Sequence, residues 1–198
     1  MSRVDLPDGE PAFGPWRPAS PADVLDALGR PRVLAVDGRS GAGKTTFVSR
    51  LVTAAPGAAV VHTDDVAWYQ DFFEWADLLV EGVVMPWRAG RDVAYRPPAW
   101  DERARSGAIT AAAAAPLLVV EGVGVGRRAL SGLFDALVWV QTERGLATER
   151  GIARDGDSAF WTEWEARERP FLAVERPWER ARLVASGTSA EVLLVAEP

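Results

Sequence analysis

The chain has 198 residues, which is enough for one α/β domain with a full hydrophobic core and argues against a second large domain. Its formal net charge of -6 argues against a general binder of nucleic acid or of anionic membranes, because such proteins present an excess of basic surface. The absence of cysteine excludes disulfides and thiolate chemistry. Residues 1–8 lack the apolar core of a signal peptide, and no apolar run approaches the roughly 20 residues of a membrane-spanning helix, so we expect a cytoplasmic protein.

The N-terminal residues 1–20 contain four prolines and little hydrophobic periodicity, which predicts a flexible, extended arm without a catalytic group. A helix is predicted to follow, because Ser20 suits the N-cap, Pro21 suits the first helical position and Gly29 suits the end. We expect residues 21–198 to form a single domain.

Short apolar runs alternate with helical segments through the rest of the chain. The predicted strands comprise residues 32–37, 58–62, 117–121, 136–140 and 192–195. The predicted helices comprise residues 46–54, 75–85, 142–153 and 159–173, and a further helix contains Arg127, Arg128 and Leu130. Continuous apolar strands that alternate with helices indicate a parallel sheet covered on both faces, so we expect an α/β three-layer sandwich with a five-stranded parallel sheet.

The first predicted strand leads into residues 38–45, whose sequence Gly-Arg-Ser-Gly-Ala-Gly-Lys-Thr matches G-x-x-x-x-G-K-[ST] at every fixed position. The flanking strand and helix supply the context of a phosphate-binding P-loop, in which backbone amides at a helix N-terminus surround phosphate oxygens. Lys44 is predicted to reach the β- and γ-phosphates, and the Thr45 hydroxyl to bind Mg²⁺. The predicted nucleotide-binding residues are Gly38, Arg39, Ser40, Gly41, Ala42, Gly43, Lys44, Thr45 and Thr46.

Acidic side chains follow three of the predicted strands, and they are Asp37, Asp64, Asp65 and Glu121. Ligands bind at the carboxyl ends of the strands in such a sheet, so we expect these acids to converge on one site. Phosphoryl transfer needs oxygen ligands for Mg²⁺ and a carboxylate that accepts the proton of the attacking hydroxyl. We predict Asp64 as the catalytic base, and Thr45, Asp64 and Glu121 as metal ligands. The alternatives are helix capping by the two aspartates and a strand-end turn at Glu121.

Three arginines, Arg144, Arg150 and Arg154, fall within the predicted helix 142–153 or directly after it. Arg150 and Arg154 are four residues apart and therefore share a helix face. Arginines on a mobile helix over an active site neutralise charge on a transferred phosphoryl group, so residues 143–157 are predicted to form a lid in which Arg150 and Arg154 are catalytic. Surface ion pairs with neighbouring glutamates are the alternative, and for Arg144 both interpretations stay open.

Nine tryptophans are more than a core of this size usually requires, and an aromatic cluster follows the aspartates at residues 68–75. An acceptor base or sugar could stack there. The predicted substrate-binding residues are Asp65, Trp68, Tyr69, Arg96 and Trp100. Core packing is the alternative for each aromatic residue, and it is the preferred interpretation for Trp161 and Trp164, which are three residues apart in a predicted helix.

Four segments carry a family resemblance, namely residues 37–46 (DGRSGAGKTT), 61–65 (VHTDD), 118–124 (LVVEGVG) and 149–156 (ERGIARDG). Through them the chain resembles the uridine kinase-like family of P-loop kinases, to which enzymes of the phosphoribulokinase and pantothenate kinase types are related. The resemblance spans roughly residues 30–196. It implies the P-loop NTPase fold with an arginine-bearing lid.

The resemblance also implies roles for particular residues. Asp64, just past the second strand, would act as the base, and Glu121 would help to position the metal or substrate. Arg150 and Arg154 would be the lid arginines, and residues 186–188 would border the adenine. The chain departs from authentic uridine kinases at two places. They follow the base with a Ser-Phe-Tyr-like run where this chain has Asp-Val-Ala-Trp-Tyr, and their pyrimidine-reading segment has no clear counterpart between residues 70 and 105.

Together these features predict a kinase that depends on ATP and Mg²⁺ and transfers the γ-phosphoryl group to a hydroxyl of a small molecule, for example the nucleoside uridine. The alternatives are a kinase for a sugar or another alcohol, and a non-catalytic or regulatory nucleotide-binding protein. A GTPase would need an Asn-Lys-x-Asp motif, which is absent because Lys44 is the only lysine. The sequence does not decide between ATP and GTP beyond the family resemblance, and it does not specify the oligomeric state.

Overall fold

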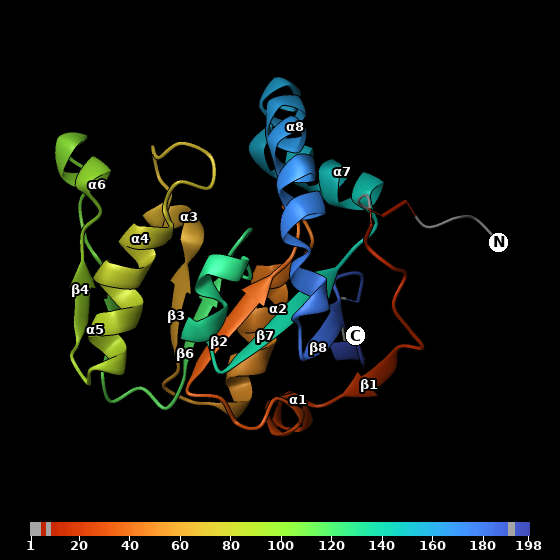
Figure 1. Cartoon of the computed structure of the whole chain (residues 1–198), viewed down its shortest axis with the longest axis horizontal. Coiled ribbons are helices and arrows are strands. Elements are labelled where there is room, and N and C mark those ends of the chain that lie inside the picture. The colour runs from red at the N-terminus through yellow and green to blue at the C-terminus, as the bar shows by residue number, and fades with distance from the viewer. Residues whose placement is uncertain (1–4, 7–8, 190–192) are drawn as a thin grey trace.

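Strand β2 (Val33–Asp37) is the middle one of the five parallel strands in a seven-stranded sheet (Figure 1). The computed structural model describes residues 5–6, 9–189 and 193–198. The strand order is β1-β9-β8-β7-β2-β6-β3. The parallel strands are β2, β3 (Ala59–His62), β6 (Leu118–Glu121), β7 (Ala136–Gln141) and β8 (Leu183–Ser186). At one edge, β9 (Leu193–Ala196) and β1 (Arg17–Ala19) continue the sheet in antiparallel orientation. The prediction of an α/β fold with a largely parallel sheet is confirmed.

The predicted count of five strands is wrong, because the described residues form seven strands in the main sheet and two in a separate small sheet. The sequence does not reveal β8, since Leu-Val-Ala-Ser offers only three apolar residues. The predicted last strand, residues 192–195, corresponds to β9, which is antiparallel, and Val192 lies outside the described residues. β1 contains Pro18, which cannot donate a ladder hydrogen bond and is tolerated because β1 is an edge strand.

The longer helices begin and end close to where the sequence predicts. They are α1 (Pro21–Ala27), α2 (Lys44–Leu51), α7 (Arg144–Asp155) and α8 (Ser158–Glu175). Ser20 caps α1, as predicted, in a capping box with Asp23. The predicted helix 75–85 is a continuous run of α4 (Ala76–Leu79), the π-helix η2 (Val80–Val84) and α5 (Met85–Arg88). The shorter elements are η1 (Val52–Ala54), α3 (Thr63–Val66), β4 (Val93–Tyr95), α6 (Pro98–Glu102), β5 (Ile109–Ala111), η3 (Arg128–Leu133) and η4 (Pro177–Glu179).

Helices cover both faces of the sheet. Alternate residues of β2 point to opposite faces, so the strand contributes to a hydrophobic core on each side. Val33 and Ala35 belong to a core that also contains residues of α4, η2, α5 and α8. Leu34 and Val36 belong to a second core, which also contains residues of α1 and α2. Because β2 is buried along its whole length, the loop that follows it starts from a fixed position in the middle of the molecule.

Residues 9–20 run beside the sheet, although the sequence predicts a flexible arm for residues 1–20 (Figure 1). β1 pairs with β9, and only 8% of the surface of Glu10 is exposed. This part of the predicted arm therefore belongs to the folded domain. Residues 1–4 and 7–8 lie outside the described residues.

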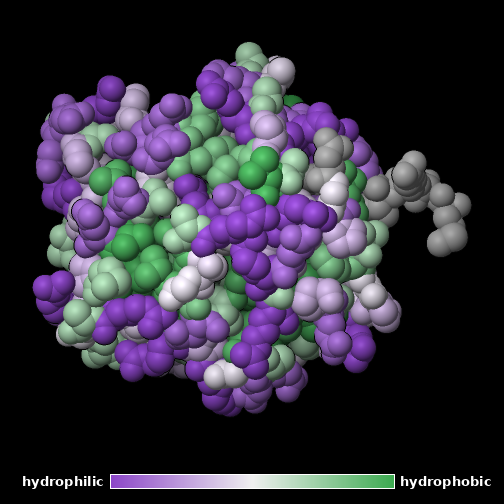
Figure 2. Space-filling model, viewed as in Figure 1, coloured by the Kyte–Doolittle hydropathy of each residue, from purple (hydrophilic) through white to green (hydrophobic). Residues whose placement is uncertain are grey.

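The surface mixes polar and apolar side chains. Figure 2 shows hydrophilic and hydrophobic residues interspersed over one face of the molecule. The exposed large hydrophobic residues in the described part of the chain are Tyr69, Met85, Phe160 and Val174. No helix within the described ranges is both long enough and apolar enough to cross a membrane. Phe160 differs from the other three because it borders the main cavity, which is described below.

Candidate active site

The loop of residues 38–43 joins β2 to α2, and two of its glycines have left-handed backbone conformations that other residues rarely adopt. Gly43 caps α2 with a φ of 94°, and Gly41 has a φ of 75°. A Cβ atom on Gly41 would lie 2.0 Å from the carbonyl oxygen of Ala147 in α7. The two glycines therefore allow the loop to turn tightly and allow α7 to pack directly against it.

Lys44 is the first residue of α2, and only 9% of its surface is exposed. Its Nζ donates hydrogen bonds to the carbonyl oxygens of Gly38 at 2.9 Å and of Arg39 at 3.0 Å. These bonds hold the ammonium group against the loop. Lys44 lies at the N-terminal end of the eight-residue helix α2, where the helix dipole favours anions. The loop therefore presents backbone amides and a positive charge at one place.

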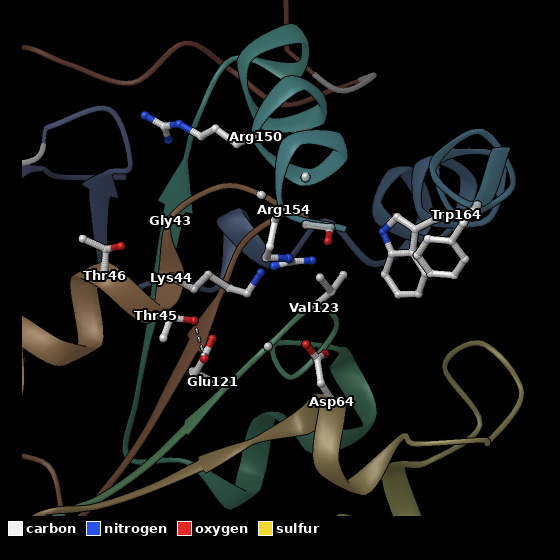
Figure 3. A pocket seen from close by; sticks show the side chains of 15 residues that line it. Gly43, Lys44, Thr45, Thr46, Asp64, Glu121, Val123, Arg150, Arg154 and Trp164 are labelled. Carbon is white, nitrogen blue, oxygen red and sulfur yellow. Dashed lines mark hydrogen bonds between the residues drawn. The ribbon is translucent and has the colours of Figure 1, made fainter. Parts of the chain in front are cut away.

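A cavity of about 470 Å³ opens over this loop (Figure 3). Ten of the predicted site residues line it, and they are Ser40, Gly41, Gly43, Lys44, Thr45, Thr46, Asp64, Glu121, Arg150 and Arg154. The wall is completed by residues that the sequence analysis does not assign to the site, namely Gly122, Val123, Gly151, Phe160 and Trp164. Three predicted loop residues, Gly38, Arg39 and Ala42, are buried and do not line the cavity.

Thr45, His62 and Glu121 form a hydrogen-bonded group beside the cavity. Thr45 Oγ1 donates to Glu121 Oε1 at 2.8 Å, and His62 Nδ1 lies 2.5 Å from the same oxygen. Burial tends to raise the pKa of Glu121, but the hydrogen bonds from His62 and Thr45 and the charge of Lys44 outweigh burial and lower it. Glu121 is therefore an anion at neutral pH. Because the Thr45 hydrogen points to Glu121, the Thr45 oxygen keeps lone pairs available for a cation.

Asp37 ends β2, yet it is fully buried and does not line the cavity. Its Oδ1 accepts hydrogen bonds from the backbone amides of Gly38 (2.7 Å) and Gly124 (2.9 Å), and its Oδ2 accepts one from the amide of Gly126 (2.8 Å). Burial raises the pKa of Asp37 to about 6, and the three amide hydrogen bonds oppose that rise. The sequence groups Asp37 with the site acids, but in the structure it holds the loop that carries residues 122–123 of the cavity wall.

The adjacent aspartates at the start of α3 have different surroundings. Asp64 lines the cavity, and Figure 3 shows its carboxylate pointing into it. Asp65 instead pairs with Arg105, and its backbone oxygen accepts a hydrogen bond from Trp100 Nε1 at 2.9 Å. The N-cap of α3 is His62, so neither aspartate caps this helix. Asp64 is therefore the aspartate that is placed to meet a ligand.

None of the five predicted substrate-binding residues lines the cavity. Trp100 is 4% exposed, and the centroid of its ring lies 3.8 Å from the guanidinium carbon of Arg105. Arg96 donates to the backbone oxygen of Arg105 at 2.9 Å. Trp68 and Tyr69 contact each other edge to face, with ring centroids 4.6 Å apart. Together with Asp65, these residues hold the segment around α6 against α3.

Two aromatic residues of α8, Phe160 and Trp164, line the cavity instead. Their ring centroids are 6.3 Å apart with an interplanar angle of 26°, and Phe72 lies 5.5 Å from Trp164 on centroids. The preferred interpretation of Trp164 as a packing residue is therefore incomplete, because part of it faces the cavity. The sequence contains one indication that these two residues act together. Phe160 and Trp164 are four residues apart and therefore share a face of the helix that follows the predicted lid.

Arg150 and Arg154 both line the cavity from α7, which agrees with the shared helix face that their spacing predicts. Arg150 Nη1 donates to the backbone oxygen of Gly187 at 2.8 Å. Arg154 donates from Nε and Nη2 to the Asp155 carboxylate at 2.7 and 2.9 Å. The two arginines therefore face different ends of the cavity.

Arg144 forms ion pairs and does not line the cavity, which favours the ion-pair interpretation over a role in the site, although its partners differ from those suggested by the sequence. Its Nη2 lies 2.8 Å from Asp5 and its Nε lies 3.7 Å from Glu165, whereas the sequence suggests neighbouring glutamates. The contact of α7 with the P-loop at Gly41 places the arginine-bearing helix over the loop. Movement of residues 143–157 as a lid stays a prediction.

The oxygen atoms at this site suit a magnesium ion. Mg²⁺ is usually bound through one or two carboxylates together with substrate phosphates and waters, and not by an all-protein cage. In the part of the chain that the structure describes, no group of three or more histidine, cysteine or acidic side chains could hold a metal by itself. Thr45, Asp64 and Glu121 offer hydroxyl and carboxylate oxygens on the cavity wall, so they fit a Mg²⁺ ion that is shared with phosphates.

A second cavity of about 180 Å³ shares Gly43, Thr46 and Arg150 with the first. Its wall includes residues 186–189, and thus the loop that the family resemblance places beside the adenine. The shared residues connect the P-loop to that loop. A nucleotide whose phosphates lie on the P-loop would therefore have room to extend toward residues 186–189.

No protein-family model matches the sequence, and no curated protein matches it. Among solved structures, the chain is similar to a possible uridine kinase from Bacillus stearothermophilus, with a TM-score of 0.51 and 18% sequence identity over 82% of this chain and 98% of that chain. It is also similar to TT1252 from Thermus thermophilus, with a TM-score of 0.49 and 21% identity over 81% and 90% of the two chains. The chain therefore shares its fold with that possible uridine kinase. Activity and substrate have to be inferred from the site, because one fold supports many functions.

Proposed function

We propose that this protein is a kinase that uses ATP and Mg²⁺ to transfer the γ-phosphoryl group to a hydroxyl of a small molecule. The observation that carries the proposal is a single cavity that gathers Lys44 of the P-loop, the hydrogen-bonded pair of Thr45 and Glu121, Asp64 and Arg154. Phosphoryl transfer needs anion binding, metal ligands, an oriented hydroxyl and neutralisation of charge within one site. The cavity supplies a candidate for each of these four requirements.

The nucleotide would bind with its phosphates on the P-loop amides and Lys44. Thr45 and Glu121 would hold Mg²⁺, directly or through water, and the ion would neutralise charge on the phosphate oxygens. Arg150 bonds to Gly187 and lines both cavities, so it would lie along the nucleotide between the phosphates and the adenine.

Asp64 would orient or deprotonate the acceptor hydroxyl from the β3 side of the cavity. Arg154 lies on the opposite wall, in α7. The hydrogen bond with Asp155 raises the pKa of Arg154, and the charges of Asp64 and Glu121 add to this effect. Arg154 would balance the charge that develops on the transferred group.

The acceptor would bind on the side of Asp64, where Phe160 and Trp164 present aromatic rings to the cavity. Such rings favour an acceptor with a flat part that can stack. A nucleoside such as uridine combines a flat base with a reactive hydroxyl, and it is the first acceptor we propose; a sugar or another alcohol is the second. A purely regulatory nucleotide-binding protein would have no need of Asp64 and Glu121, which both line the cavity.

The test is a coupled assay of ADP release from Mg-ATP with a panel of nucleosides, sugars and small alcohols. Asp64→Asn serves as the blank, and Asp65→Asn is the matched control, because Asp65 is adjacent in sequence and lies outside the cavity. We expect one acceptor to stimulate release in the wild type and in Asp65→Asn but not in Asp64→Asn. Slow release with every acceptor, despite tight nucleotide binding, would contradict the kinase and favour a regulatory protein. Greater damage in Asp65→Asn would contradict the assignment of the base.

A further inference from the structure

Residues 10–13, which we call the N-terminal strap, hold the side chain of Gln141 at the end of β7. Glu10 Oε1 accepts hydrogen bonds from Gln141 Nε2 and from Trp139 Nε1, both at 2.6 Å. The backbone amide of Phe13 donates to Gln141 Oε1 at 3.1 Å. The strap therefore occupies both the donor and the acceptor of the Gln141 side-chain amide, and it fixes the last residues of β7.

Gln141 belongs to a group of residues that holds the P-loop from outside the cavity. Its carbonyl oxygen accepts a hydrogen bond from the Gly187 amide at 2.9 Å. The next residue, Thr142, donates from Oγ1 to the carbonyl oxygen of Ala42 in the P-loop at 2.8 Å. A Cβ atom on Gly187 would lie 1.7 Å from that same Ala42 oxygen. A shift of Gln141 would therefore move contacts on the P-loop and on the loop after β8 together.

Arg39, the second residue of the P-loop motif, lies behind the loop and is only 2% exposed. Its Nη2 is 3.5 Å from Glu168 and 3.7 Å from Glu165, both on α8. Glu168 Oε1 also accepts a hydrogen bond from the Ser40 amide at 2.6 Å. A buried guanidinium is costly unless carboxylates compensate its charge. Two glutamates of α8 thus anchor this side of the P-loop.

Glu10 adds a further carboxylate to this buried group. Burial raises the pKa of Glu10 to about 7, while the hydrogen bonds from Gln141 and Trp139 and the charge of Arg39 lower it. The negative charge of Glu168 also raises the pKa of Glu10. The strap is therefore coupled to the P-loop by contact through the hydrogen bonds of Gln141 and Thr142, and the charge of Arg39 acts on Glu10 in addition.

We propose that the N-terminal strap is a positioning element of the nucleotide site, which keeps the P-loop in its phosphate-binding shape through Glu10. The strap itself touches no ligand and acts through Gln141 and Thr142. The inference rests on the proposed function only in requiring that the P-loop binds a nucleotide. Linkage then demands a reciprocal effect: if docking of the strap favours nucleotide binding, a bound nucleotide favours docking of the strap to the same extent.

The first test compares affinities for Mg-ADP, measured by isothermal titration calorimetry on the full chain. Glu10→Ala removes the carboxylate, whereas Glu10→Gln keeps an oxygen that can accept from Trp139 and Gln141. Asp26→Asn is the control, because Asp26 is an exposed carboxylate paired with Arg30 on the surface. We expect Glu10→Ala to weaken Mg-ADP binding on the order of tenfold. Glu10→Gln should recover most of this loss, and Asp26→Asn should match the wild type.

The second test follows hydrogen exchange of the Phe13 amide in the wild type, with and without Mg-ADP. This amide reports on strap docking directly, because its partner is Gln141 Oε1. Mg-ADP should slow its exchange if the strap and the nucleotide site are coupled. The measurement needs no variant, so it decides the question even if Glu10→Ala does not fold.

Unchanged Mg-ADP affinity in Glu10→Ala, accompanied only by a lower melting temperature, would assign the strap to overall stability and overturn the proposal. Exchange of the Phe13 amide that is insensitive to Mg-ADP would overturn it as well. Failure of the wild type to bind Mg-ADP would overturn both the strap and the proposed function. Binding of Mg-ADP without phosphoryl transfer to any acceptor would overturn the proposed function alone.

Discussion

Thr45 Oγ1 donates a hydrogen bond to Glu121 Oε1 across 2.8 Å and so links the first turn of α2 to the end of β6. The strands that lead to this contact, β2 and β6, pair in parallel with Val36 opposite Glu121. A register fixed by a fully buried central strand leaves the carboxylate little freedom to move away from the P-loop. The sheet itself therefore sets the spacing between the hydroxyl and the acid.

The charge of Glu121 should govern the magnesium requirement. Glu121→Gln keeps the side-chain volume and an oxygen that can accept from Thr45, but it removes the negative charge that would face a cation. We expect the Mg²⁺ concentration for half-maximal ADP release to rise about 10- to 100-fold. His62→Asn, which alters a partner of Glu121 and retains the carboxylate, should give a smaller change. An unaltered Mg²⁺ titration in Glu121→Gln would exclude Glu121 from the metal site.

Lys44 should not be replaceable by arginine. The 22 Lys+Arg residues of the chain include a single lysine, and its Nζ bonds to the carbonyl oxygens of Gly38 and Arg39 in a buried position. A planar guanidinium does not fit where a compact ammonium contacts two backbone oxygens. Lys44→Arg and Lys44→Ala should both lower turnover at least about 100-fold, while circular dichroism shows an intact fold. Normal turnover in Lys44→Ala would rule out the P-loop mechanism.

Gly41 should tolerate no side chain. Gly41→Ala combines a left-handed backbone conformation with a Cβ atom 2.0 Å from the Ala147 oxygen, so α7 would have to move off the P-loop. We expect a loss of stability above about 2 kcal/mol in urea unfolding, together with weaker nucleotide binding. Gly145→Ala is the matched control on α7, where a Cβ meets nothing within 4 Å, and it should be neutral or stabilising by up to about 1 kcal/mol. Equal behaviour of the two variants would show that α7 does not depend on this contact.

The parts of the site that the sequence predicts are those set by neighbours in the chain. The P-loop motif, the acid at the end of β6 and the four-residue spacing of Arg150 and Arg154 all depend on local geometry. Most of the motif, the acid and both arginines line one cavity in the structure. Asp64 is predicted from the sheet as well as from its neighbours, because parallel strands bring the ends of β3 and β6 to the same edge.

Other features depend on partners that are distant in the sequence. Asp65 does not line the cavity and instead pairs with Arg105, forty residues later. Glu10 looks like part of a proline-rich arm, since its partners Trp139 and Gln141 are more than 120 residues away. β8 is a run of three apolar residues and a serine, and its pairing with β7 identifies it as a strand. Local patterns contain no information on any of these contacts.

Asp37 should matter for stability more than for chemistry. It accepts three backbone amide hydrogen bonds, and Asn at this position would turn an NH₂ group toward at least one of these donors. A buried donor left without an acceptor costs about 1–3 kcal/mol, and we expect Asp37→Asn to lower the free energy of unfolding by this amount. Asp26→Asn, at an exposed ion pair, should stay within about 0.5 kcal/mol of the wild type. Wild-type stability in Asp37→Asn would mean that the loop after β6 does not need this anchor.

Glu10 should make the fold less stable as the pH rises. Its pKa is about 7 in the folded protein against an ordinary value of 4.5, so the folded state holds the proton more tightly than the unfolded chain. The stabilisation is complete below pH 4.5 and is lost as the pH rises through 7. Arg39 and Glu168 are the charged groups that act on the pKa of Glu10. Asp37, whose pKa is raised to about 6, should also make the fold less stable as the pH rises.

Urea unfolding as a function of pH should show this contribution. The free energy of unfolding of the wild type should fall across the window by an amount on the order of 3 kcal/mol from Glu10. Glu10→Gln cannot ionise and should lose that part of the slope, so its advantage over the wild type should grow with pH. Parallel curves for the two proteins would show that Glu10 is not buried against Trp139 and Gln141 in solution, and that the strap does not dock as it does in the structure.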